Sequence, residues 1–95
     1  MWIIQYEGSL MNKLARQIAE ILYKKDPVDI GTVENNLVDE YYDEADAIAY
    51  NFELGNIKSK DDLRECFKDV FIEFFSFEVE ISDEIINAVY ELLNK

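Results

Sequence analysis

The chain has 95 residues, of which 49% are hydrophobic and 14% aromatic, and its 21 acidic against 9 basic residues give a net charge of −12. This length allows one domain with one core, and the apolar fraction excludes a disordered chain. The charge excludes direct binding to a nucleic-acid backbone, because such binding requires clustered Lys and Arg side chains.

The rarer residue types exclude further classes of protein. The single cysteine, Cys66, excludes an internal disulfide framework, and the absence of histidine removes the usual nucleophile partners and metal ligands. No apolar run has the length of a membrane span, and residues 1–5 make a poor signal peptide. We therefore expect a cytoplasmic protein that is not an enzyme, has no catalytic residues, metal site or cofactor, and does not enter a membrane.

The first elements in chain order are an ambiguous segment and a helix. Residues 1–10 could be a short strand, a loose arm or a helix extension. Apolar residues at steps of three and four, among them Leu14, Ile18 and Leu22, predict a helix from about Ser9 to Lys25. Ser9 is its expected N-cap, and Asp26-Pro27 ends it because the residue before proline avoids the helical conformation.

A second helix is predicted from near Thr32 or Asn35 to about Leu54, before a Gly55-Asn56 stop signal. Its apolar residues form one narrow stripe: Leu37, Tyr41, Ala45, Ile48 and Phe52.

Ser59 is the expected N-cap of a third helix, in which Cys66 lies beside the apolar stripe and is expected to be a buried, inert thiol. Ile72 and Phe75 fall off that stripe, so this helix is expected to be contacted on two sides. Residues 77–81 alternate between apolar and acidic and could be extended, and Ser82 caps a last helix. The pattern predicts an all-α, compact four-helix bundle with short connections, forming a single domain over residues 1–95, with 1–10 as a candidate peripheral extension.

The acidic residues are unevenly distributed along the chain. Nine acids and no Lys or Arg occur from Asp26 to Ile57, and seven acids and no base occur from Asp69 to Asn94. Evenly mixed charge would be expected if solubility were the only demand. On a helical wheel, one face opposite the apolar stripe of the second helix holds six polar or acidic side chains: Asp39, Tyr42, Asp43, Asp46, Tyr50 and Glu53.

Tyrosine surrounded by carboxylates is typical of interface anchors, and the acids would steer a basic partner toward the site. The alternative is that Tyr42 and Tyr50 lie with their rings over neighbouring loops or the first helix. Under the first interpretation, the six residues form a partner-binding face.

Two resemblances bear on the fold and on this interpretation. Asp26-Pro27-Val28 followed by Asp39-Glu40-Tyr41 resembles a small bacterial family of acidic, all-helical domains of unknown function, over roughly residues 11–75. This similarity implies a fold and no activity. In kind only, Tyr41-Tyr42 between Asp39-Glu40 and Asp43-Glu44 resembles the arrangement in immunity proteins of bacterial toxin systems, which are acidic helical domains that bind a basic nuclease.

The leading hypothesis is an immunity- or antitoxin-like module that occludes a basic toxin or nuclease domain. The alternative is a small scaffold or regulatory domain that acts through an apolar surface, as a monomer or as a weak homodimer through Ile72 and Phe75.

Overall fold

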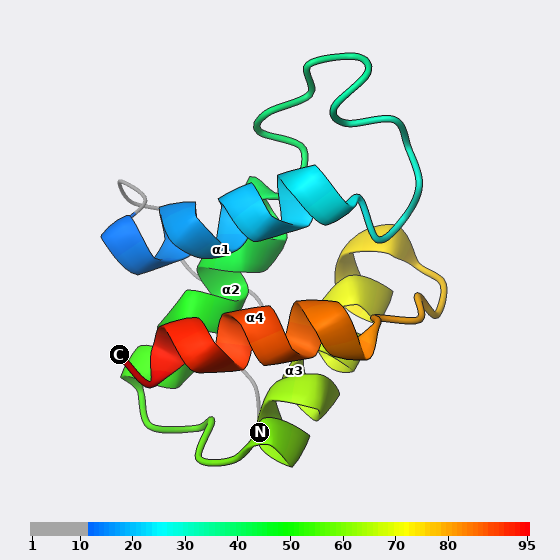
Figure 1. Ribbon diagram of the computed structural model, residues 1–95. Coiled ribbons are helices and arrows are strands. Elements are labelled where there is room, and N and C mark those ends of the chain that lie inside the picture. Colours follow the sequence, from blue (N-terminus) through cyan, green and yellow to red (C-terminus); the bar gives the residue numbers. More distant parts are fainter. Residues whose placement is uncertain (1–11) are drawn as a thin grey trace.

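The computed structural model describes residues 12–95, which form four α-helices and no strand (Figure 1). The helices are α1 (Lys13–Lys25), α2 (Tyr42–Glu53), α3 (Lys60–Phe75) and α4 (Asp83–Leu93). Helix α1 packs against α2 and α4, and α3 packs against the same two helices. The predicted all-α, four-helix fold is confirmed. None of the helices in residues 12–95 combines the length and the apolar character needed to cross a membrane.

Helix α1 is bounded by side-chain and backbone caps at its two ends. The Asn12 side chain accepts a hydrogen bond of 2.8 Å from the Ala15 N–H, whereas the expected cap Ser9 and residues 1–10 lie outside the described residues. Asp26 ends the helix in the left-handed conformation, with φ of 48°, and its N–H donates to the Leu22 carbonyl at 2.8 Å. The predicted end of this helix is confirmed.

The second helix begins later than the sequence pattern predicts. Residues 32–36 form a single turn, which Asn36 closes in the left-handed conformation with φ of 55°. The Leu37 N–H donates back to the Thr32 carbonyl at 2.8 Å, as in a helix C-terminal motif. Because this turn interrupts the helix, α2 starts only at Tyr42. The start at Thr32 or Asn35 is therefore wrong, and the α1–α2 connection is a long loop that stands out from the helices (Figure 1).

The core is made by the apolar stripes of the four helices. Tyr41, Ala45 and Ile48 are buried as predicted, although Tyr41 lies just before α2 rather than within it. The other large, fully buried apolar side chains come from α1, α3 and α4: Ile18, Leu22, Leu63, Phe67, Val70, Phe71, Ile86 and Val89. Cys66 is also buried, as predicted, and burial raises the pKa of its thiol to about 12.

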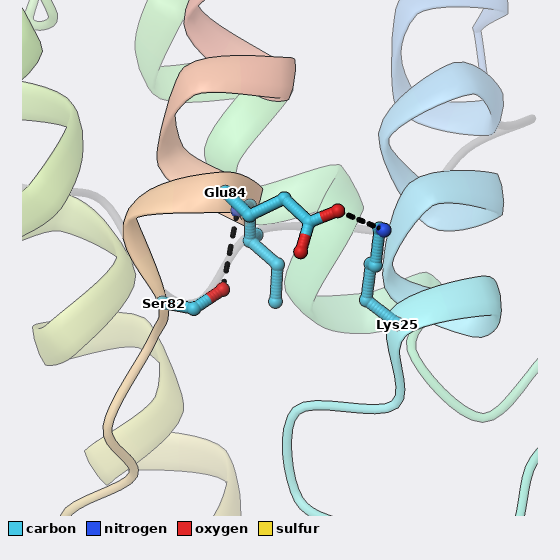
Figure 2. A network of polar contacts seen from close by, with 4 residues as sticks. Lys25, Ser82 and Glu84 are labelled. Carbon is cyan, nitrogen blue, oxygen red and sulfur yellow. Dashed lines mark hydrogen bonds and ion pairs between the residues drawn. The ribbon is translucent and has the colours of Figure 1, made fainter.

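Serine caps begin both C-terminal helices, and an ion pair joins α4 to α1. Ser59 Oγ accepts from the Asp62 N–H at 3.1 Å, and Ser82 Oγ accepts from the Ile85 N–H at 3.3 Å. Figure 2 shows Lys25 at the end of α1 paired with Glu84 in the first turn of α4. The pair places a cation at a negative helix end and an anion at a positive one, which suits both helix dipoles.

Candidate protein-binding surface

The predicted binding residues divide into an exposed group at the start of α2 and a less exposed group further along it. Asp39 lies in the turn before α2, where its carbonyl accepts from the Tyr42 N–H at 3.2 Å. The prediction that Asp39 lies on the helix is therefore wrong. Asp39 and Asp43 are exposed, and Tyr42 between them is 40% exposed. These three residues, with the exposed Glu40, are called the α2 start cluster below.

The other three predicted residues, Asp46, Tyr50 and Glu53, lie further along α2. Asp46 and Tyr50 are half-buried, and each is engaged in an interaction within the chain. Glu53 is exposed in the last turn, and its carboxylate accepts a hydrogen bond from the side-chain amide of Asn12. The six predicted residues thus share one stretch of the chain but not one uniformly exposed face.

Tyr42 lies at a boundary between acidic and basic parts of the surface. A pocket of about 320 Å³ separates α1 from the start of α2, and Tyr42 lines it together with Val38, Tyr23, Arg16 and other α1 residues. The helical wheel predicts that Tyr42 projects from the middle of a purely acidic face. In the structure it does not. It presents part of its ring to solvent and part to the side chains of α1.

The acids at the start of α2 also have a structural role. Asp43 lies in the first turn of the helix, where its negative charge complements the positive end of the helix dipole. No side chain caps this helix by hydrogen bonding, so the acidic first turn compensates in part for the missing cap. Asp39 and Glu40 lie ahead of this turn and add to the same negative potential.

Tyr41 and Asp26 hold the loop that carries the α2 start cluster. The Tyr41 hydroxyl donates to Asp26 Oδ1 at 2.8 Å and accepts from the Val28 N–H at 3.0 Å. The same carboxylate accepts from the N–H groups of Ile30, Gly31 and Thr32 at 2.7–3.3 Å. Burial alone would raise the pKa of Asp26, but these hydrogen bonds from Tyr41 and the three backbone groups outweigh it and lower the pKa.

One acid of this region is buried rather than exposed. Glu44 is only 4% exposed, and its Oε1 atom has no hydrogen-bond partner. Burial, and next the charge of Asp43, raise its pKa to about 7, with a smaller contribution from Glu40. Glu44 therefore exchanges its proton near neutral pH. Nothing in the Tyr-Tyr-Asp-Glu sequence distinguishes it from the exposed acids around it.

A second acidic surface, which the residue pattern did not single out, is formed by α3 and the segment that leads into α4. A groove of about 760 Å³ runs between α3 and the segment that leads into α4. Six of its side chains are acidic and two are basic: Asp61, Glu65, Asp69, Glu78, Glu80 and Asp83, with Arg64 and Lys68. The spacing of Asp61, Glu65 and Asp69 at four-residue steps is the signal that predicts a shared helix face.

A metal-binding cluster and an exposed thiol are both absent from the part of the chain that the structure describes. Among the described residues, no group of three or more Cys, Asp or Glu side chains could hold a metal ion. The thiol of Cys66 is buried in the core, although its sequence neighbours Glu65 and Asp69 line the groove beside α3. Comparisons with protein-family models, with curated proteins and with solved structures find no match to this chain.

Proposed function

We propose that the chain is an acidic protein-binding module that binds a basic partner through the α2 start cluster, in the manner of an immunity or antitoxin protein that occludes a toxin or nuclease domain. The observation that carries the proposal is Tyr42, which is 40% exposed between the exposed carboxylates of Asp39 and Asp43. A half-exposed aromatic ring offers apolar contact area on binding, and the flanking charges attract a cationic surface.

Because contacts within the fold already order the α2 start cluster, less conformational entropy is lost when a partner binds. Tyr41 is 1% exposed and is hydrogen-bonded to Asp26, so the chain on the N-terminal side of Tyr42 is already ordered. An ordered anchor loses less conformational entropy when a partner binds than an anchor on a free loop does. The negative potential of the first turn of α2 would act mainly on the association rate.

The experiment is affinity capture followed by kinetics on the captured protein. The wild-type chain and a Tyr42→Ala variant serve as matched baits, and a basic protein enriched only by the wild type is purified. We expect its association rate to fall about tenfold or more between low and physiological salt, because exposed charges are screened. Asp43→Lys should slow association further, and Tyr42→Ala should speed dissociation.

The control is Glu73→Lys, an exposed charge reversal on α3 that changes the net charge by the same amount as Asp43→Lys. It should leave the association rate within about twofold of the wild type. Equal effects of Asp43→Lys and Glu73→Lys, or normal binding by Tyr42→Ala, would refute the α2 start cluster as the binding site.

A scaffold that acts through an apolar surface is the second candidate, and one observation favours it. Ile72 and Phe77, near the C-terminal end of α3, are 40% and 54% exposed. Phe75 is half-buried and packs its ring against Tyr41, Phe71 and Phe77. If this surface forms a homodimer, sedimentation should show a dimer that is insensitive to salt and is dissociated by Ile72→Asp.

A further inference from the structure

Residues 77–81, between α3 and α4, form a segment whose backbone has no hydrogen-bond partner within residues 12–95. No hydrogen bond among residues 12–95 involves the N–H or carbonyl groups of residues 77–81. Val79 is buried and Ile81 is half-buried, whereas Glu78 and Glu80 between them are exposed. This alternation is that of an extended chain with one side packed on the core. Its backbone groups are therefore available in the way those of an edge strand are.

The acidic groove lies directly beside this segment. One wall is α3, with Asp61, Glu65 and Asp69, and the other is residues 78–83. Its volume of about 760 Å³ is within the range of ligand-binding clefts. The carboxylates of α3 thus lie across the groove from the segment that includes residues 78–81.

Two ion pairs cross the groove, and both are exposed. Arg64 pairs with Asp83 at 2.8 Å, and Lys68 pairs with Glu78 at 3.8 Å. The side chains of both pairs are between 46% and 78% exposed, so each pair contributes little to stability and can exchange partners. Six carboxylates against two cations leave the groove acidic even with both pairs intact.

We propose that this groove binds a basic peptide segment in extended conformation, which adds to residues 77–81 as a paired strand and places Lys or Arg side chains against the acids of α3. Main-chain pairing supplies affinity and the charges supply selectivity, as in other cases of strand addition. Nucleic acid is disfavoured by the charge of the groove. The proposal goes beyond the function proposed above, because the groove is lined by none of the residues of the α2 start cluster.

The probe is a fluorescein-labelled octapeptide of alternating Lys and Val, and the readouts are fluorescence anisotropy and the amide NMR signals of residues 77–81. We expect binding with chemical-shift changes and slower hydrogen exchange in that segment. A peptide of the same sequence with alternate backbone amides methylated keeps its charge but loses strand pairing. The affinity of the methylated peptide should be lower by about tenfold or more. An octapeptide of alternating Glu and Val should lose affinity to a similar extent.

Matched variants separate the groove from general electrostatics and from the α2 start cluster. Glu65→Lys, in the groove, should weaken binding of the Lys-Val peptide about tenfold, whereas Glu73→Lys on the same helix should change it less than about twofold. Tyr42→Ala should have no effect. Circular dichroism establishes that each variant is folded.

Several outcomes would overturn the proposal. They are no binding, equal binding of the methylated peptide, equal effects of the two charge reversals, or no spectral change in residues 77–81. Loss of binding in Tyr42→Ala would assign the peptide to the α2 start cluster instead. If the peptide does not bind in the groove, the function proposed for the α2 start cluster still stands. If the α2 start cluster does not bind a basic partner, the proposal for the groove still stands.

Discussion

The Tyr41 hydroxyl donates a hydrogen bond of 2.8 Å to the carboxylate of Asp26, across a loop of fourteen intervening positions. The bond joins the residue that ends α1 to the residue that precedes α2. The same two residues belong to the Asp-Pro-Val and Asp-Glu-Tyr segments of the sequence. The geometry gives these segments a structural role: they close and order the α1–α2 loop.

Tyr41→Phe tests this loop closure. The substitution keeps the buried ring but removes the bonds to Asp26 and to the Val28 N–H, so the Val28 N–H loses its partner and Asp26 keeps only its three backbone donors. We expect a loss of about 1–3 kcal/mol in the free energy of unfolding, measured by denaturant titration. Tyr42→Phe, which removes a hydroxyl from a half-exposed ring, is the control and should cost less than about 0.5 kcal/mol. Equal losses would show that the hydroxyl of Tyr41 is not the closing element.

The lowered pKa of Asp26 predicts that the stability of the protein depends on pH in the acid range. Its pKa is lowered in the folded protein from the ordinary value of 3.8, because the hydrogen bonds it accepts outweigh its burial. Its contribution is therefore present above pH 3.8 and is lost as pH falls through the lower, folded pKa. The stability difference between wild type and Asp26→Asn should be larger at pH 6 than at pH 2.5, by denaturant titration at each pH. A difference independent of pH would contradict the role of the charge.

Glu44 predicts the opposite dependence near neutral pH. Its pKa rises from 4.5 in the unfolded chain to about 7 in the folded protein, mainly through burial. The folded state thus binds the proton more tightly, and stability falls as pH rises from 4.5 to 7. Glu44→Gln should remove this fall and stabilise the protein at pH 8 by about 1–3 kcal/mol relative to wild type.

At pH 4 the Glu44→Gln variant and the wild type should have nearly equal stability, since Glu44 is protonated in both states of the wild type. Asp43→Asn, at the exposed neighbouring acid, is the control and should show no comparable gain at pH 8. A destabilised Glu44→Gln at pH 8 would mean that the charged form is the one the fold accommodates.

Cys66 predicts an unreactive thiol. The side chain is buried, and its pKa is raised to about 12 by burial and by the charge of Asp69. Because the thiolate is the reacting form, a disulfide reagent should modify native protein far more slowly than denatured protein. The rate under native conditions should rise with denaturant in step with unfolding. Fast modification of the native chain would show that helix α3 opens locally around Cys66.

The elements that the sequence predicts correctly are those defined by local chemistry. Ser59 and Ser82 begin α3 and α4, Asp26-Pro27 ends α1, and Cys66 lies in the core. For the three helix boundaries the deciding interaction lies within a few residues, such as a hydroxyl that accepts an N–H three positions later. The start of α2 was missed because Asn36 adopts the left-handed conformation. The Asn35-Asn36 pair was the available signal, since asparagine is second to glycine at such positions.

For the candidate surfaces too, the sequence predicts some features and not others. Their acidic composition follows from the sequence alone, since two long stretches of the chain contain no base. The sequence alone does not tell which of these side chains are exposed. Glu44 is buried beside the exposed Asp43, and Tyr41 is buried beside the half-exposed Tyr42. Neighbouring residues on a helix face different directions, and the packing of the other helices decides which direction is the core.

The sequence by itself determined an all-α domain with an acidic surface, because helical periodicity, caps and net charge are properties of neighbouring residues and of composition. Only the tertiary structure decided that Asp26 and Tyr41 meet, that Glu44 is buried, and that the acids of α3 line a groove beside an unpaired backbone segment. These features join residues that are distant along the chain or depend on which side of a helix is covered. Their formation depends on how the four helices pack, which local interactions do not specify.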